Sequence, residues 1–445
     1  MSAPVAHSFR SNARAVLVLG LPLIGSHMAQ FSLHVTDTIM LGWYGVNDLA
    51  AGALGATVFF TFFTLGAGYA NAVMPLVATA AAGDHDTEVR RATRMGMWLS
   101  LGYAAVVLPI FFFAEAILAQ MGQEPQIADL GGQYLRIVGL GVAPALLVMV
   151  LKSYLAALGR TQVVLWVTVS AVFVNAGLNW VFIFGNLGVP EMGARGAAIA
   201  SVLVQLFTLA VMLAYAAWLP ALRRYTLLTR FWRPDWQAMR QVNALGLPIG
   251  LAMLAETGLF AASAVMMGWL GAQTLAAHSI ALEITAMFFM IHMGLSNAAT
   301  VMVGRARGRG DMEGLRAAAR AAVILSMLVA VTTMLIYFIF GELMVGVFLP
   351  LLEAGMQMTR EGKTSQSAAI VIFSSALVNP VFGWSLTVLL DNLGLIGDKE
   401  RGQSLSHLHR WVIPTIVFIV LCAVMLGIGM FPGIPAMLES FRIDL

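Results

Sequence analysis

Three acidic side chains lie inside long apolar stretches of the sequence, where a carboxylate is costly to place. They are Asp37, Glu256 and Glu283. A charged side chain at the centre of a bilayer costs about 2.5 to 3.5 kcal/mol on insertion scales, so such groups are candidates for binding cations or protons. We therefore take these three acids as the first candidate site residues.

Asp37 shares one helix face with other polar side chains. Gln30, His34 and Asp37 follow at intervals of four and three residues, and His27 extends the same face by one turn. A carboxylate one turn from an imidazole can load and release a proton. The alternative is that Asp37 only bonds to a neighbouring helix. The insertion cost favours function for Asp37, whereas a structural role is favoured for the two histidines.

Two amides offer partners for such an acid. Asn175 and Asn179 are one turn apart in the stretch VNAGLNWVFIFG, and their oxygens can coordinate a cation while their nitrogens can bond to a carboxylate. Considered alone, two Asn in a membrane helix more often serve packing. With Asp37 opposite them in one lobe, an ion-binding role is favoured.

The composition shows which elements must position these residues. The chain is 60% hydrophobic and only 11% charged, against about 25% charged in soluble domains. Apolar runs long enough to cross a bilayer of about 30 Å are indicated. They cover residues 15–40, 49–80, 95–119, 132–158, 163–186, 196–219, 244–270, 275–303, 317–349, 366–390 and 411–431.

These runs predict an all-α polytopic membrane protein with eleven spanning helices. A spanning barrel would alternate apolar and polar residues, whereas these runs are apolar all round. The first run is too long for the core of a signal peptide and has no cleavage site, so we expect it to stay. The single cysteine, Cys422, allows no disulfide framework, and we expect no metal centre.

Basic residues alternate between the predicted loops. Arginine and lysine gather at residues 90–94, 152–160, 223–240, 305–316 and 399–410, and the other loops hold few. Cytoplasmic loops are the basic ones, so we expect the N-terminus in the cytoplasm. This pattern favours topology and contacts with anionic membrane lipids over nucleic-acid binding as the reason for the net charge of +3.

The sequence contains an internal repeat at an offset of 226 residues. LGLP at 19–22 falls on LGLP at 245–248, and MLGWYG at 40–45 falls on MMGWLG at 266–271. Six helices separate the copies, so both have the same orientation in the membrane. Asp37 falls on Ser263, Glu256 on Gln30 and Glu283 on Thr57, which means that the lobes share a scaffold but not their charges.

The repeat predicts two lobes joined by a basic linker. We expect a first lobe with six spanning helices, the linker, the first half of a second lobe with three, and an atypical remainder with about two. The bounds are 10–218, 219–243, 244–349 and 350–445. Two lobes with a cleft between them are typical of alternating-access transporters.

Several motifs together resemble the multidrug and toxic compound extrusion (MATE) family, in particular its NorM-like branch. They are VTDTIMLGWYG, LKSYLAALGRTQ, NAGLNWVFIFGNLGVPEMGARGAAIAS and LAAHSIALEITAMFFMIHMGLSNAATVMVGRARGRGD, and the resemblance covers residues 10–349. It implies an antiporter that exports amphipathic, usually cationic drugs in exchange for Na⁺ or H⁺. It further implies that Asp37, Asn175 and Asn179 bind the ion or substrate and that Glu256 belongs to a second cation site. The role of Glu283 is our own inference.

The remainder of the chain departs from that family. No acid follows Glu361 before Asp391 within the stretch where the family carries a second acid in its tenth helix, and the repeat fades there. A divergent lobe, a fusion and a frame or assembly error are all open. This departure favours coupling through the first lobe, with H⁺ or Na⁺ at Asp37 and no other cofactor.

Other functions remain as alternatives. A flippase for lipid-linked precursors would line its cleft with several arginines, but only Arg136 and Lys152 lie within the apolar runs. A membrane enzyme would need paired catalytic groups or a histidine-rich metal set, and the eight histidines are scattered. A third alternative is a membrane protein that does not transport, and only the atypical remainder of the chain favours it. We expect a monomer in the inner membrane of a bacterium.

Overall fold

The computed structural model describes residues 9–120, 125–227, 229, 231–269 and 272–353, and the structural statements below refer to these. Apart from one short 3-10 turn, Asn186–Gly188, their regular structure is α-helical throughout, as expected. The helices are α1 (Phe9–Tyr44), α2 (Val46–Ala82), α3 (Asp86–Phe112), α4 (Ala114–Gln120), α5 (Pro125–Gly139), α6 (Val142–Ala157), α7 (Thr161–Phe182), α8 (Ala194–Trp218), α9 (Pro220–Arg223), α10 (Trp236–Trp269), α11 (Ala272–Gly308) and α12 (Met312–Glu353).

Eight of the described helices are long and apolar enough to cross a membrane, or nine if the bent pair α5 and α6 forms one span. The nine apolar runs predicted up to residue 349 each correspond to one of these spans. The last two predicted runs, 366–390 and 411–431, lie outside the described residues, as do all but the first residues of the atypical remainder.

One predicted span is not continuous. The run 132–158 forms α5 and α6, whose axes differ by 48°. The break falls at glycines: α5 ends at Gly139, and a Cβ on Gly141 would lie 2.9 Å from the carbonyl oxygen of Val138. Because glycine is a poor helix former and only glycine fits there, the chain bends at this point.

The third predicted span is also displaced. Helix α3 begins at Asp86, before the predicted start at 95, and ends at Phe112, before the predicted end at 119. Its first turn holds Asp86 and Glu88, which suit the positive end of a helix dipole. Hydropathy does not detect such a polar first turn, and the last residues of the predicted run belong to the separate helix α4.

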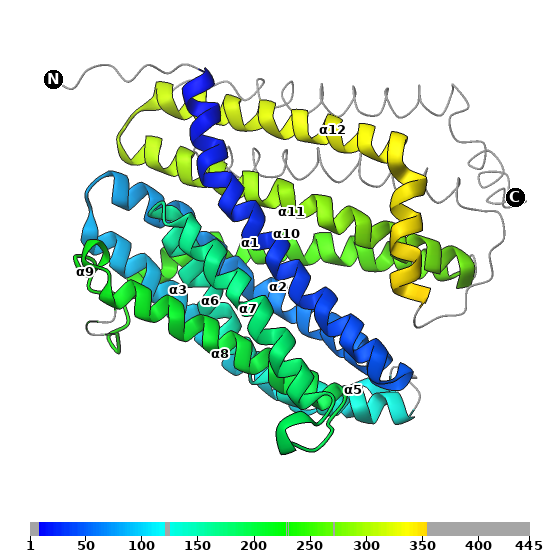
Figure 1. Cartoon of the computed structure of the whole chain (residues 1–445). Helices are drawn as coiled ribbons and strands as arrows, with labels where there is room; N and C mark the ends of the chain where they lie inside the picture. The colour runs from blue at the N-terminus through cyan, green and yellow to red at the C-terminus, as the bar shows by residue number, and fades with distance from the viewer. Residues whose placement is uncertain (1–8, 121–124, 228, 230, 270–271, 354–445) are drawn as a thin grey trace, which may run out of the picture.

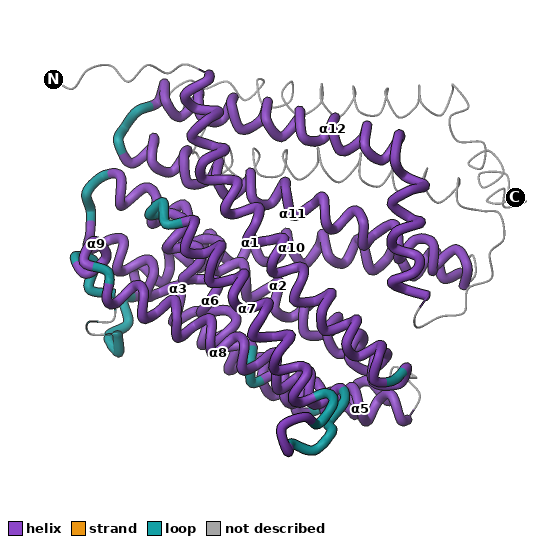
Figure 2. The backbone as a smooth tube through the Cα atoms, in the orientation of Figure 1, coloured by secondary structure: helices purple, strands orange, loops and turns teal. Residues whose placement is uncertain are grey.

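Helices α1 and α2 pack against both halves of the molecule. Figure 1 shows α1 crossing diagonally between the group formed by α3 and α5–α8 and the group formed by α10–α12, and it packs on α7 and α11. Helix α2 packs on α10 and α11 as well as on α3 and α6. Figure 2 shows that short loops connect nearly all of these helices. We call α1–α8 the first lobe and α10–α12 the second lobe.

The internal repeat is visible in the helix bounds. Shifting α2 by 226 residues gives the bounds of α11, and shifting the end of α1 gives a position one residue past the end of α10. Both α1 and α10 contain a proline, Pro22 and Pro248, which the same shift superimposes. The two lobes therefore begin with the same pair of long helices.

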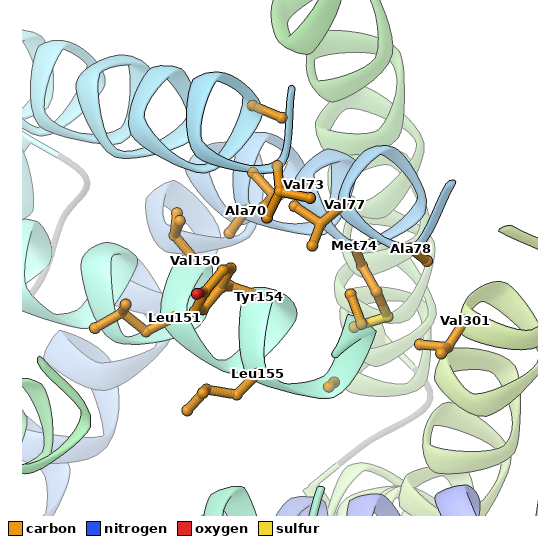
Figure 3. Close-up of a cluster of buried hydrophobic side chains, with 14 of the residues drawn as sticks. Ala70, Val73, Met74, Val77, Ala78, Val150, Leu151, Tyr154, Leu155 and Val301 are labelled. Carbon is orange, nitrogen blue, oxygen red and sulfur yellow. The ribbon is translucent and has the colours of Figure 1, made fainter. Parts of the chain in front are cut away.

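The core of the first lobe fixes α6 against α2. Figure 3 shows Val73 and Val77 of α2 beside Leu151, Tyr154 and Leu155 of α6, and all five are fully buried. Since successive residues of a helix point about 100° apart, this packing turns Lys152 away from the core that holds Leu151. The sequence therefore sets the rotation of α6 through its apolar residues.

The lobes approach each other closely along one half of their length. Gly68 of α2 lies against the backbone of Gly246 and Gly250 on α10, and Gly308 of α11 lies against Thr79. The guanidinium of Arg305 donates a hydrogen bond of 2.9 Å to the carbonyl oxygen of Ala157. These contacts gather towards the N-terminal end of α1, where the α2–α3 and α11–α12 connections lie together in Figure 1.

Candidate functional site

The side chain of Asp37 is held by amides from α7. Asn175 Nδ2 donates to Asp37 Oδ1 at 3.0 Å and Asn179 Nδ2 donates to the same oxygen at 2.6 Å. The hydroxyl of Ser201 on α8 donates to the other carboxylate oxygen at 3.4 Å. The structure thus brings together Asp37, Asn175 and Asn179, three of the predicted site residues, and adds Ser201. We call these four residues the Asp37 cluster.

The spacing of the two asparagines places both on one face of α7. They are one turn apart, which turns both amides towards α1 because α1 and α7 pack on each other. Both side chains are almost fully buried, at 1% and 0% exposed. Asn179 Nδ2 also donates to Asn175 Oδ1 at 3.3 Å, which ties the pair together. The cluster is therefore a fixed arrangement around a half-buried carboxylate.

The cluster also offers oxygen atoms for a cation. Asn179 Oδ1 is buried and has no hydrogen-bond partner in the described part of the chain. It lies on the same side chain whose nitrogen contacts Asp37. Carboxylate and amide oxygens are the ligands that hard cations prefer, and a carboxylate alone suffices for a proton. The donor set therefore fits either Na⁺ or H⁺.

The polar face predicted on α1 splits into two environments. His34 is exposed and lies within electrostatic range of both Asp37 and Glu283 of the second lobe. Gln30 does not reach the Asp37 cluster. Its Oε1 instead accepts a hydrogen bond of 3.0 Å from Lys152 Nζ on α6. Gln30 was predicted beside Asp37 from helix periodicity, which cannot show that a cation on another helix competes for it.

His27 links the two lobes. Asn297 on α11 lies 3.0 Å from His27 Nε2, and the amide nitrogen can only donate. The imidazole therefore accepts through this nitrogen, so it is neutral here. This is a packing role of the kind favoured for the histidine, although the partner is an amide of the other lobe rather than a backbone carbonyl.

The two acids of the second lobe lie apart from this cluster. Glu256 is half-buried on α10 and has no hydrogen bond or ion pair among the described residues, and Glu283 on α11 is also half-buried. The counterpart of Asp37, Ser263, has its hydroxyl 3.3 Å from His278 Nε2. The described part of the second lobe therefore contains no copy of the Asp37 cluster.

A small cavity lies next to the cluster inside the first lobe. Its volume is about 70 Å³, and its walls come from α1, α2, α6, α7 and α8 with Asn297 of α11. Lys152, Gln30 and His27 are among the polar residues that line it, and Leu23, Met74 and Met149 are among the apolar ones. From the sequence, Lys152 counts only as part of a basic cytoplasmic cluster and as one of too few cations for a flippase, and its place in a cavity is not predicted.

These features define a polytopic α-helical membrane protein of two repeated lobes with an acid cluster inside the first. A family model for MatE matches residues 22–181 and 248–354, which is more than half of the chain. The chain therefore belongs to the MatE family, the MATE family that its motifs resemble. A model described as a protein of unknown function (DUF3360) matches residues 321–438, which include most of the atypical remainder.

Curated relatives agree with this family. The chain is 46% identical over 308 residues to a protein of Agrobacterium fabrum named "Probable multidrug resistance protein NorM", an alignment covering 69% of this chain and 66% of that protein. It is 43% identical over 343 residues to a protein of the same name from Rhizobium meliloti, covering 77% and 73%. The first of these alignments thus spans slightly less than two thirds of its relative.

Solved structures share the fold. A MOP superfamily transporter from Pyrococcus furiosus matches with a TM-score of 0.72 at 20% identity, covering 86% of this chain and 83% of that one. A structure described as the outward-facing conformation of a multidrug resistance MATE family transporter matches with a TM-score of 0.71 at 18% identity, covering 86% and 83%. At these identities the likeness concerns the fold.

Proposed function

We propose that the protein is a secondary active antiporter that exports amphipathic, cationic drugs or toxic compounds in exchange for H⁺ or Na⁺. The observation that carries this proposal is the Asp37 cluster, a carboxylate held by two buried amides inside a membrane lobe. Family membership and the names of the NorM relatives support the class of cargo.

The mechanism follows from the charge of Asp37. When the cluster faces the external side, Asp37 takes up H⁺ or Na⁺, and its charge is neutralised. The ionised carboxylate attracts a bound organic cation strongly, because the dielectric constant inside the lobe is low. Neutralisation removes most of this attraction. Release of the cargo allows the lobes to rock, and the ion leaves on the other side. Each step changes the relative stability of two arrangements of the lobes, as alternating access requires.

The close contacts between the lobes support one assignment of the state. They gather at the end where α1 begins, and the same end carries Arg305 and the basic linker. If that end is cytoplasmic, as the basic loops predict, the structure is closed towards the cytoplasm. We place the protein in the bacterial inner membrane as a monomer in contact with anionic lipids.

The flippase alternative is less favoured by the arrangement of the cations. Arg136 forms an ion pair of 2.7 Å with Glu115 and also donates to the carbonyl oxygen of Phe112. Of Arg136 and Lys152, only Lys152 lines the cavity of the first lobe. A single ammonium is a poor match for a pyrophosphate, which several arginines would bind.

Transport by purified protein in lipid vesicles tests the proposal. The ethyl ester of rhodamine B, a permanently cationic dye, is enclosed inside the vesicles, and an inward gradient of H⁺ or Na⁺ is imposed across the membrane. We expect dye to move against the ion gradient, and we expect Asp37→Asn to abolish this movement because the amide cannot exchange its charge. Movement without a gradient requirement, or movement unaffected by Asp37→Asn, would refute the mechanism.

A further inference from the structure

The cavity of the first lobe continues the space around Asp37 by one helical turn. Its wall residues Leu33, Ala171 and Gln205 lie on α1, α7 and α8. Each is four residues from a member of the Asp37 cluster on the same helix: Asp37, Asn175 and Ser201. Three helices thus give the same result, that the cavity begins about 6 Å from the cluster along the helix axes.

Lys152 lines the middle part of this cavity, whose wall residues on α6 run from Ala145 to Ala156. Its ammonium donates to Gln30 Oε1 at 3.0 Å, and no described carboxylate lies within ion-pair distance of it. An ammonium has three donors, so at least one is available to a ligand. A half-buried cation at membrane depth that faces only neutral groups is costly, and an anion would relieve that cost.

The neighbours of Lys152 do not supply that anion. His27 lies in electrostatic range of it and accepts from Asn297, and the other polar groups on the cavity wall are amides and hydroxyls such as Asn71 and Ser153. The core packing of Leu151 and Tyr154 prevents α6 from turning the lysine away. The fold therefore keeps a cation in this cavity.

The first lobe thus contains two opposite charges at a fixed separation. Gln30 and Asp37 are seven residues apart on α1, which corresponds to about 10 Å along the helix. Apolar side chains of the cavity wall, including Leu33 on α1 and Ala171 on α7, lie between these two levels. A compound with only a positive charge is attracted by Asp37 and repelled by Lys152. In a compound that also carries an anionic group, the anionic group can bind to Lys152 while the cationic group binds to Asp37.

We infer that Lys152 and Gln30 form a carboxylate subsite, so that the lobe selects amphipathic compounds that carry a carboxylate as well as a cationic group. This inference rests on the proposed function for the cargo as a whole. The ammonium bonds to the carboxylate, and the Gln30 amide nitrogen donates a second hydrogen bond. A cavity of about 70 Å³ holds the carboxylate and its nearest atoms, while the apolar body and the cationic group extend towards Asp37.

Equilibrium binding to the full-length protein in detergent tests this inference. Rhodamine B carries a carboxylate and a cationic xanthene, and in its ethyl ester an ethyl group replaces the negative charge of the carboxylate. Fluorescence anisotropy gives the dissociation constant of each dye for the parent protein and for Lys152→Gln. We expect Lys152→Gln to weaken rhodamine B binding by about tenfold or more. Binding of the ester is expected to stay within about twofold or to improve, because a repulsive charge is removed.

Two controls make the result decisive. Lys152→Arg keeps the charge and is expected to bind rhodamine B within about threefold of the parent, and ester binding to every variant reports whether the lobe is folded. Equal losses for both dyes, no loss for either, or no binding of rhodamine B by the parent would overturn the inference. Failure of gradient-driven transport of the ester would instead refute the antiport proposal and leave the contrast in binding unaffected.

Discussion

At the scale of single residues, acids with the same sequence signal have different surroundings. Asp37 is held by Asn175, Asn179 and Ser201, whereas Glu256 has no such partners among the described residues. A buried carboxylate stays charged only where hydrogen bonds or an opposite charge compensate for the cost of its burial. This condition is met at Asp37, which is why we assign coupling to the first lobe.

Removal of one amide from the cluster is expected to impair transport more than neutralisation of Glu256. Asn179→Ala removes the shortest hydrogen bond to Asp37, and hydrogen bonds to charged groups contribute about 1.5 to 3 kcal/mol. We expect the initial rate of dye movement in vesicles to fall about tenfold or more. Glu256→Gln keeps the volume of the side chain, and we expect a rate within about twofold of the parent. The reverse ranking would assign coupling to the second lobe.

The sequence predicted part of this site. The pairing of Asn175 and Asn179 with one carboxylate could be anticipated, because residues one turn apart share a helix face. The contribution of Ser201 and the bond between Lys152 and Gln30 could not. Both depend on the rotation of α8 and α6 about their axes, and core residues such as Tyr154 on other faces set that rotation.

At the scale of the helices, Asp235 secures the start of α10. Its Oδ1 accepts from the backbone nitrogen of Ala238 at 3.0 Å, as a helix N-cap does. The same carboxylate pairs with Arg91 of α3. The hydrogen bond from Arg91, together with the backbone bond from Ala238 and the nearby positive charge, holds the pKa of Asp235 below its ordinary value. One residue thus joins the second lobe to the first.

Loss of this acid is expected to lower stability in a pH-dependent manner. Because the pKa of Asp235 is lower in the folded protein, its stabilisation is present above the unfolded pKa and is lost as the pH falls through the folded one. At neutral pH we expect Asp235→Ser, which keeps a capping side chain, to cost about 1 kcal/mol. Asp235→Ala should cost about 1 kcal/mol more, for the lost cap.

Thermal unfolding of the purified variants measures this effect. The apparent Tm of Asp235→Ser is expected about 1 to 2 °C below that of the parent at neutral pH. The gap should narrow as the pH falls below about 4, the ordinary pKa of the unfolded state, and should close only below the lower pKa of the folded state, where the carboxyl is protonated in both states. The extra loss in Asp235→Ala is expected to persist. A gap between parent and Asp235→Ser that is constant with pH would show that the ion pair has no such role.

The helices themselves could be anticipated where hydropathy is the deciding property. All nine apolar runs up to residue 349 correspond to described spans, whereas the start of α3 and the bend between α5 and α6 were missed. Those two features depend on a polar first turn at Asp86 and on close packing at Gly141, and neither changes the mean hydropathy of the run.

At the scale of the whole molecule, alternating access requires lobe contacts that can close and reopen. Gly68 lies where a Cβ would overlap the carbonyl oxygen of Gly246 and the backbone nitrogen of Gly250. These are backbone atoms, so the clash cannot be relieved by a side chain. The approach of α2 and α10 therefore depends on glycine.

A side chain at Gly68 is expected to prevent this closure. For Gly68→Val we expect transport in vesicles to fall about tenfold or more, because the closed state becomes strained by at least about 1.4 kcal/mol. Gly102→Val is the matched control, since Gly102 on α3 has nothing within 4 Å of an added Cβ. Its transport is expected to equal that of the parent. Equal rates for both variants would show that the contact at Gly68 does not open and close.

The orientation of the whole molecule in the membrane determines the direction of transport. Basic residues gather at the end that holds Arg309, in the α11–α12 connection, and the connection between α7 and α8 projects Leu187, 80% exposed, from the other end. Because cytoplasmic loops carry the arginine excess, Arg309→Cys in a Cys422→Ser background should react with a membrane-impermeant maleimide only in inside-out vesicles. Leu187→Cys should react only in right-side-out vesicles, because three described spans, α8, α10 and α11, separate it from Arg309, and an odd number of spans places the two residues on opposite sides. The opposite pattern would invert the membrane orientation and would turn the state closed at Gly68 into one closed towards the outside, so that the ion and the cargo would exchange places in the proposed cycle.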